Sequence, residues 1–491
     1  MVVSIVFATT FNTTPIPTTK ITVYFKESFI NRHHSSNTKE YRLEHGVRKI
    51  RGIMTSKTRG YDIFNNLKDK DGQLKQELYK EDVKGLLSVC ECSILGETND
   101  ISEQLLRTFL NNMEEQSKAS ITIDNTLRYP YHKNLSILMV QNVLDEFDHV
   151  SFKFLHKSNN VKEWLNEVQE LARVDFGNAR MTYRYEVQQI SIWKNKHNFD
   201  KELSFARIDP FKWWMWSYGI LQGPNMSEDR IELAKAISFI YMIDDIFDGN
   251  GTSYDELLLF TEAINGWEYT DSINQLPNCM KVCFKALLET TNDFSSKILT
   301  KHGWNPEQCL RKLWTEQCNA YLIESKWRVS KYSPSPKEYL NNGIVSSGTH
   351  VVLAHAYFLM GQGINNKSLQ HLNSLPPIIS STATILRLWN DAGIHTDKTP
   401  EGNDGSYVDW YMKEHNLSLS DSDRVRRHVN RVISGAWKCL NKEYMSPTSP
   451  FSKEFKVACL NLARMVPIMY SQDESHHLRL FFGGTLDFVD R

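Results

Sequence analysis

Apolar residues recur at intervals of three and four along most of this 491-residue chain. Such spacing places apolar side chains on one face of an α-helix. The pattern is clearest in four stretches, namely Glu77–Val89, Ile101–Met113, Asn160–Ala172 and Ile231–Phe247. Strand-like alternation is scarce, and the 23 Gly and 15 Pro gather between helical stretches, as at Pro334-Ser335-Pro336. The sequence therefore predicts an all-α protein.

The length of the chain favours two domains over a single core. We place a helical N-terminal domain over 41–172 and a second helical domain over 173–491. Residues 1–40 form a leader, whose first 26 residues contain eight Ser or Thr, two Lys and no Asp or Glu. This composition is typical of a plastid transit segment. The alternative is a disordered tail without a targeting role, which leaves the protein in the cytoplasm.

The bulk composition is that of an ordinary globular protein, with 41% hydrophobic and 23% charged residues. The net charge of −1 argues against a nucleic-acid partner, because such proteins usually carry a basic patch. No run of 18 apolar residues is present, so no transmembrane segment is expected. The eight cysteines form no paired CxxC framework, which favours a reduced intracellular compartment.

The apolar helix predicted over Ile231–Phe247 ends in three carboxylates, those of Asp244, Asp245 and Asp248. Asp244 and Asp248 are four residues apart and share one helix face, where like charges repel. A helix C-terminus also disfavours anions, because the helix dipole is negative there. A divalent cation on the cluster removes both costs, and Mg²⁺ is usually held by a few carboxylates together with substrate phosphates. The alternative is a solvated acidic helix end that binds nothing.

Further motifs accompany this cluster in order along the chain. They are Phe205-Ala206-Arg207, Trp213–Trp216, Asn342–Gly348, Arg387–Asp391 and Asp404–Tyr407. The ordered set resembles the plant class I terpene synthases over about residues 60–475, and it is most similar to the subfamily that makes acyclic terpene alcohols, such as linalool and nerolidol synthases. The resemblance implies a class I terpenoid synthase helical bundle in the C-terminal domain. It also implies a barrel-like helical N-terminal domain, shortened in this chain.

The resemblance also implies roles for the acidic cluster and for two arginines. Asp244 and Asp248 bridge Mg²⁺, or Mn²⁺, to a substrate diphosphate, and Asp245 supports them. Arg207 and Arg387 grip the diphosphate, so that the catalytic residues are Asp244, Asp248, Arg207 and Arg387. Guanidinium groups and metal ions suit this task, because ionising an allylic C–O bond leaves a pyrophosphate anion.

Other matched positions are expected around the substrate. Trp216 aligns with a pocket aromatic, whose ring face stabilises a carbocation. Ser347-Gly348 corresponds to a helix break that faces the substrate, and a Gly inside a helical pattern usually has a local reason. Tyr470, with Asp473, resembles a pair near the pocket mouth. For the neighbouring Trp213 and Trp214, core packing is the expected role.

The second metal-binding motif departs from the family pattern. The family has three ligands at offsets of zero, four and eight residues, and this chain has Asn390, Ile394 and Lys398 there. Only Asn390 keeps a metal ligand, since Ile has no side-chain oxygen and Lys repels a cation. Lys398 is one candidate to contact the diphosphate directly, and Asp397 or Glu401 is a candidate substitute ligand.

The sequence therefore predicts a synthase that ionises geranyl diphosphate, or farnesyl diphosphate, with Mg²⁺. Water then quenches the cation to an acyclic alcohol such as linalool or nerolidol. We expect a monomer whose partner is the prenyl diphosphate. The alternatives are a weak or inactive relative that binds prenyl diphosphates, a chain-elongating prenyltransferase, and a helical scaffold.

Overall fold

The computed structural model describes residues 181–223, 225–248, 251–268, 271–397 and 405–470, together with Leu106, Arg107, Leu110, Lys133 and Leu135. The chain divides into two compact units, Met1–Phe176 and Gly177–Arg491. The leader expected over 1–40 and almost all of the domain expected over 41–172 lie outside the described residues. Of the helix expected over Ile101–Met113, the described residues Leu106, Arg107 and Leu110 are helical.

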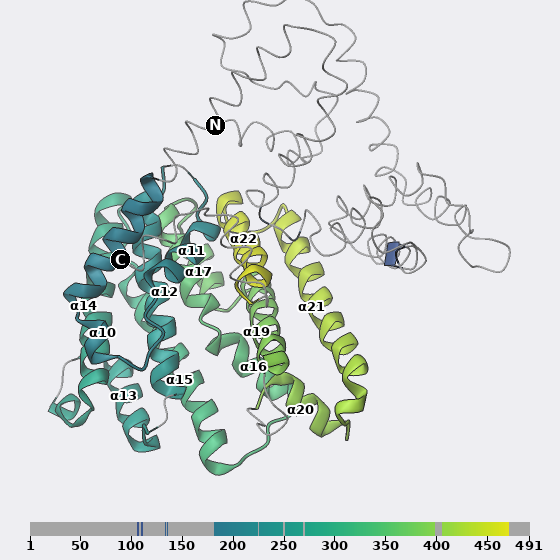
Figure 1. Ribbon diagram of the computed structural model, residues 1–491. Helices are drawn as coiled ribbons and strands as arrows, with labels where there is room; N and C mark the ends of the chain where they lie inside the picture. The colour runs from purple at the N-terminus through teal and green to yellow at the C-terminus, as the bar shows by residue number, and fades with distance from the viewer. Residues whose placement is uncertain are drawn as a thin grey trace, which may run out of the picture. The chain divides into compact units, whose positions relative to one another are not determined.

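All regular structure in the described part of the second unit is helical, as Figure 1 shows. Residues 181–196 form the first helical stretch. The elements that follow are α10 (Phe199–Glu202), α11 (Pro210–Ile220), α12 (Ser227–Asp248), α13 (Tyr254–Gly266), η4 (Asp271–Gln275), α14 (Asn278–His302), α15 (Glu307–Ser330), α16 (Pro336–Ser346), α17 (Thr349–Met360), α18 (Asn366–Leu372), α19 (Pro377–Asp397), α20 (Tyr407–Glu414), η5 (Leu419–Asp421), α21 (Ser422–Met445) and α22 (Lys453–Met469). The all-α prediction is confirmed for this part of the chain.

Local sequence signals set several helix boundaries. α13 and α16 both begin with capping boxes, in which Ser253 and Ser335 exchange hydrogen bonds with the glutamates three residues later. Pro336 occupies the first turn of α16, where its missing N–H costs nothing. Gly303 ends α14 in the left-handed region at φ 70°. The predicted helix over Ile231–Phe247 is confirmed, because α12 contains it.

The core of the bundle is α17, which is buried on every side. Its residues from Thr349 to Leu359 are all buried, as expected for a helix without a solvent face. It packs against α12, α15, α19 and α22 (Figure 1). By length and hydropathy, the stretch Pro336–Met360 is the one span in the described residues that passes as membrane-crossing. Since 78% of its most apolar window is buried inside the protein, it is a core segment.

A buried ion pair holds the start of the bundle together. The Glu186 carboxylate, fully buried, accepts hydrogen bonds from Arg230 Nη2 at 2.6 Å and from Trp214 Nε1 at 2.6 Å. Arg230 Nη1 also donates to the carbonyl oxygens of Leu221 and Gly223, at 3.0 and 2.6 Å. These contacts tie the helical stretch 181–196 to α11 and α12, and so fix the helices that carry the Arg207 and Asp244 regions.

Candidate active site

One cavity in the second unit collects residues from α11, α12, α15, α16, α17, α19 and α22. Its volume is about 720 Å³, including space open to solvent. Part of the wall is aliphatic, formed by Ile220, Ile237, Ile240, Val352, Leu386 and Leu462. The wall also contains seven residues singled out from the sequence, namely Arg207, Trp216, Asp244, Ser347, Arg387, Asn390 and Tyr470. A cavity that is apolar with a few convergent polar groups is the usual form of a small-molecule site.

Arg207 binds two of the three carboxylates at the end of α12. Its Nη2 lies 2.6 Å from Asp244 Oδ2, and its Nε donates to Asp245 Oδ1 at 2.7 Å. The Arg207 backbone N–H also donates to Asp245 Oδ2, at 2.6 Å. Asp248 instead faces Arg328, with 3.1 Å between Asp248 Oδ1 and Arg328 Nη1. The cluster is therefore divided, since Asp244 lines the cavity whereas Asp245 and Asp248 do not.

Burial shifts the protonation of two of these carboxylates, Asp244 and Asp248. Burial raises the pKa of Asp244 to about 6, and the charge of Asp248 adds to the rise, although Arg207 opposes it. Burial likewise raises the pKa of Asp248, against the effect of Arg328. Both shifts mean that ionising the pair costs free energy in the protein without a cation.

The acidic end of α12 suits a hard divalent cation only as part of a larger ligand set. Within the described residues, no group of three or more His, Cys, Asp or Glu side chains is arranged to hold a metal ion. Asp244 and Asn390 line the same cavity from α12 and α19 and offer oxygen ligands. Mg²⁺ is usually held by one or two carboxylates plus water and substrate phosphates, so this sparse donor set fits Mg²⁺ bound together with a phosphate ligand.

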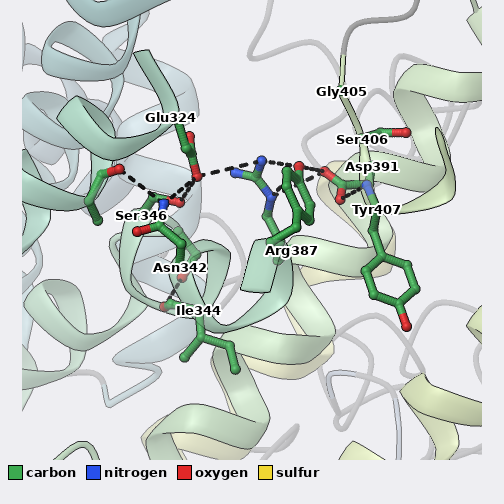
Figure 2. Close-up of polar contacts among 12 residues, drawn as sticks. Glu324, Asn342, Ile344, Ser346, Arg387, Asp391, Gly405, Ser406 and Tyr407 are labelled. Atoms are coloured by element: carbon green, nitrogen blue, oxygen red, sulfur yellow. Dashed lines mark hydrogen bonds and ion pairs between the residues drawn. The ribbon is translucent and has the colours of Figure 1, made fainter. Parts of the chain in front are cut away.

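Arg387 lies on the α19 side of the cavity and is held on several sides. Its Nε lies 3.1 Å from the Tyr339 hydroxyl and 3.2 Å from Asp391 Oδ1, and its Nη2 lies 3.9 Å from Glu324 Oε1. Figure 2 shows the guanidinium between Glu324 on one side and Asp391 on the other. Burial by itself lowers the pKa of Arg387, but Tyr339, Asp391 and Glu324 together raise it well above the usual value. Arg387 is thus a fixed cation in the cavity wall.

The expected helix break separates α16 from α17. Ser347 lines the cavity, and Gly348 adopts the left-handed region at φ 70°. A Cβ on Gly348 would lie 2.7 Å from side-chain atoms of Ile240, so both the backbone conformation and the close approach of α12 require glycine. Gly348 itself does not line the cavity, and its contribution is the break that turns Ser347 toward it.

Trp216 lies in an aromatic group at the cavity. Its Nε1 donates to the Tyr241 hydroxyl at 2.8 Å, and its ring centroid is 6.2 Å from that of Tyr470. Trp213 and Trp214 are fully buried and pack in the core, as expected from the sequence. Asp473, expected beside Tyr470, lies outside the described residues.

Tyr241 and Tyr321 line the cavity but were not singled out from the sequence. The guanidinium carbon of Arg207 lies 5.2 Å from the centre of the Tyr241 ring, which is within range of a cation–π contact. A signal existed for Tyr241, because it precedes Asp244 by three residues and so shares its helix face. Nothing local marks Tyr321, which reaches the cavity from α15.

Only part of the second metal motif, where this chain departs from the family pattern, lies within the described residues. Asn390 lines the cavity. Ile394 belongs to α19 one turn later, but its side chain is outside the described part, as are the side chain of Asp397 and the residues Lys398 and Glu401. The proposals about these four positions therefore remain predictions from the sequence.

Residues 195–439 match the family model described as "Terpene synthase family, metal binding domain". An (E)-nerolidol synthase of Cannabis sativa is 40% identical over 93% of this chain and 80% of its own length. A chloroplastic tricyclene synthase of Antirrhinum majus is 41% identical, over 84% and 70%. A chloroplastic S-(+)-linalool synthase of Arabidopsis thaliana is 39% identical, over 85% and 72%. The predicted resemblance to nerolidol and linalool synthases is confirmed, and tricyclene synthases join them.

The fold is similar to that of isoprene synthase from grey poplar leaves, solved in complex with three Mg²⁺ ions and dimethylallyl-S-thiolodiphosphate. The TM-score is 0.75, with 28% identity, and the match covers 90% of this chain and 88% of that one. The predicted all-α architecture of the plant terpene synthases is therefore confirmed. On the identity and coverage of these relatives, this chain belongs to the terpene synthase family, whose members are lyases that act on diphosphates.

Proposed function

We propose that this terpene synthase ionises geranyl diphosphate with Mg²⁺ and quenches the allylic cation with water to give an acyclic alcohol. Farnesyl diphosphate is the second substrate to test. The observation that carries the proposal is the meeting of two polar walls in one cavity whose remaining wall is mainly aliphatic and aromatic. Arg207 and Asp244 contribute one wall, and Arg387 and Asn390 contribute the other.

The polar walls suit the diphosphate end of such a substrate. Mg²⁺ at the Asp244 side would neutralise the diphosphate and stabilise the pyrophosphate that leaves. Arg387 supplies a fixed positive charge from α19 without any rearrangement of its own contacts. Arg207 is shared between Asp244 and Asp245, so it turns toward a diphosphate once Asp244 has another cationic partner.

The remaining wall suits the hydrocarbon end. The aromatic rings of Trp216, Tyr241, Tyr321 and Tyr470 line the cavity together with aliphatic side chains. Ring faces stabilise a carbocation as they do an ammonium group, and the aliphatic surface keeps water away from it. An allylic cation is therefore protected until water is admitted at its tertiary carbon.

Relatives support an alcohol product. Both the nerolidol and the linalool synthase are about 40% identical to this chain and carry the name of an acyclic alcohol. The tricyclene synthase at 41% identity is named for a cyclised hydrocarbon, so cyclisation is the competing outcome of the same ionisation.

The test is incubation of the purified chain with geranyl or farnesyl diphosphate and Mg²⁺ or Mn²⁺, with volatile products identified. Linalool or nerolidol as the main product supports the proposal, whereas a cyclic hydrocarbon contradicts the quenching step. No product with either metal, together with binding of inorganic pyrophosphate, favours the inactive relative suggested by Ile394 and Lys398. In that case the double variant Ile394→Thr, Lys398→Glu should restore turnover.

We further propose that the protein acts as a monomer in plastids. The tricyclene and linalool synthases above are named chloroplastic, and the leader over 1–40 has a matching composition. Residues 1–40 fused to a fluorescent protein should enter plastids in plant cells, and cytoplasmic fluorescence would contradict this assignment. Light scattering of the purified chain should give the monomer mass.

A further inference from the structure

We propose that Asp391 is the positioning residue for Arg387, and that it is not a metal ligand although it follows Asn390 directly. This inference rests on the proposed function, because it assigns Arg387 to the diphosphate. The two neighbours diverge in the structure. Asn390 lines the cavity, whereas Asp391 does not, and only 2% of Asp391 is exposed.

The Asp391 carboxylate joins three helices. Its Oδ1 lies 3.2 Å from Arg387 Nε, one turn earlier on α19, and accepts a hydrogen bond from the Tyr339 hydroxyl of α16 at 3.2 Å. Its Oδ2 accepts from the backbone N–H of Tyr407, the first residue of α20, at 3.0 Å (Figure 2). Both carboxylate oxygens are therefore engaged inside the protein, away from the cavity.

The contacts restrict the guanidinium to one orientation. Tyr339 holds Nε and Nη2 through its hydroxyl, and Asp391 approaches Nε from the same edge. Nη1 takes no part in these contacts. A guanidinium held in one geometry loses less entropy when it binds an oxyanion, and this is the advantage of a preorganised site.

The stem of Arg387 is fixed as well. A Cβ added to Gly343 of α16 would lie 3.0 Å from Arg387 Cγ and 3.3 Å from Cδ. The absence of a side chain at Gly343 thus lets the arginine lie close against α16, where the Tyr339 hydroxyl is within reach. Asp391, Tyr339 and Gly343 form one support for a single cation.

The test is calorimetric binding of inorganic pyrophosphate in the presence of Mg²⁺ to the full chain. Asp391→Asn keeps an oxygen that can accept from Tyr407 but removes the charge that orients Arg387. We expect pyrophosphate affinity to fall about tenfold or more, since hydrogen bonds to charged groups are worth factors of this size. At saturating pyrophosphate, the Mg²⁺ concentration for half-maximal binding should stay as in the wild type. If that concentration rises instead, Asp391 is a metal ligand and the inference is wrong.

A double-mutant cycle separates positioning from direct action. Arg387→Met keeps the stem and removes the guanidinium. If Asp391 acts through Arg387, then Asp391→Asn should weaken pyrophosphate binding little further in the Arg387→Met background. Fully additive losses would overturn the inference.

Two further variants keep the test decisive if Asp391→Asn folds poorly. Tyr339→Phe removes one hydroxyl and leaves no buried charge unpaired, and it should weaken pyrophosphate binding about threefold. The matched control is Asp409→Asn, which disturbs the capping box at the start of α20 without touching Arg387. An effect of Asp409→Asn equal to that of Tyr339→Phe would make the support merely structural.

Failure of the inference and failure of the proposed function give different results. If the wild type binds no pyrophosphate with Mg²⁺ or Mn²⁺, the proposed function falls and the inference falls with it. If the wild type binds pyrophosphate and the Asp391→Asn protein binds it equally well, only the inference is overturned.

Discussion

Each polar wall of the cavity pairs an arginine with an aspartate, but the two pairs differ in exposure and in their further contacts. On the α12 wall, Arg207 is 54% exposed and two carboxylates share it. On the α19 wall, Arg387 is only 15% exposed, and Asp391 is buried beneath it. Around the end of α12, three carboxylates share two arginines, and burial together with the charge of Asp248 raises the pKa of Asp244. The ion pairs of the α12 wall can therefore change partners when a cation binds, whereas those of the α19 wall are held in place.

This difference teaches how a binding site divides its tasks. A wall with excess carboxylates gains most from a divalent cation, because the ion relieves their repulsion. A wall with a buried, satisfied arginine offers its charge without reorganisation, which is the condition for strong electrostatic stabilisation of a leaving anion.

The largest expected effect on turnover comes from a substitution in the α12 wall. Asp244→Asn keeps the shape of the side chain and removes the charge that would hold the metal ion. Turnover of geranyl diphosphate should fall by about 10²- to 10³-fold, as when one strong electrostatic contribution is lost. Product formation per folded enzyme is the measurement. The control is Asp255→Asn on the exposed face of α13, and an equal loss in both variants would contradict a special role for Asp244.

On the α19 wall, even a substitution of Arg387 that keeps the positive charge should lower turnover. Arg387→Lys cannot reproduce the planar fork that contacts Tyr339 and Asp391, because an ammonium is a point charge on a flexible stem. We expect kcat/KM to fall about 10- to 50-fold, in line with losing about 1.4–2.3 kcal/mol from charged hydrogen bonds. Arg207→Lys should cost less, since the proposed function has Arg207 leave its carboxylate partners to bind the diphosphate. A larger loss of kcat/KM for Arg207→Lys than for Arg387→Lys would contradict the proposed difference between the two walls.

The pH dependence of stability and of Mg²⁺ affinity should come from the α12 wall. The pKa of Asp244 is raised from 3.8 to about 6, so the folded protein binds a proton there more readily than the unfolded chain does. Ionising Asp244 therefore costs stability as pH rises from 3.8 through about 6, and a bound cation offsets that cost. Mg²⁺ binds the ionised form, so its affinity should fall about tenfold between pH 7.5 and 5.0.

Calorimetry of Mg²⁺ with pyrophosphate at the two pH values checks this expectation, and thermal unfolding at each pH shows how much of the change belongs to the fold. An affinity for Mg²⁺ that is equal at pH 7.5 and 5.0 would mean that Asp244 does not hold the ion.

The smallest effect is expected at Arg328, which caps the end of α12. It donates to the Phe247 carbonyl oxygen at 2.7 Å and faces Asp248 at 3.1 Å, and half of its side chain is exposed. Such a cation at a helix C-terminus contributes below about 1 kcal/mol. Arg328→Gln should lower stability to denaturant by that amount and change turnover by less than about threefold. A loss as large as that of Arg387→Lys would place Arg328 in the diphosphate site.

Several positions were predictable because their signal is local or is carried by the family motifs. The Asp244–Asp248 spacing on a strongly apolar helix needs no tertiary information. Arg207, Arg387 and Asn390 were identified by their motifs, and all three line the same cavity. Tyr321 and the Glu324 contact with Arg387 were not predictable, because each joins helices distant in the sequence.

The sequence by itself determined the all-α class, the helix over Ile231–Phe247 and the acidic face at the end of α12, because these depend on patterns within a few residues. It also marked the break at Ser347-Gly348, where glycine supplies a conformation that other residues resist. Only the tertiary structure decided which side chains share a wall. Arg207 meets Asp245 across 38 residues. Asn390 lines the cavity, whereas its neighbour Asp391 is buried away from it. A helix directs adjacent side chains to different faces, and the packing of α19 determines which face lines the cavity.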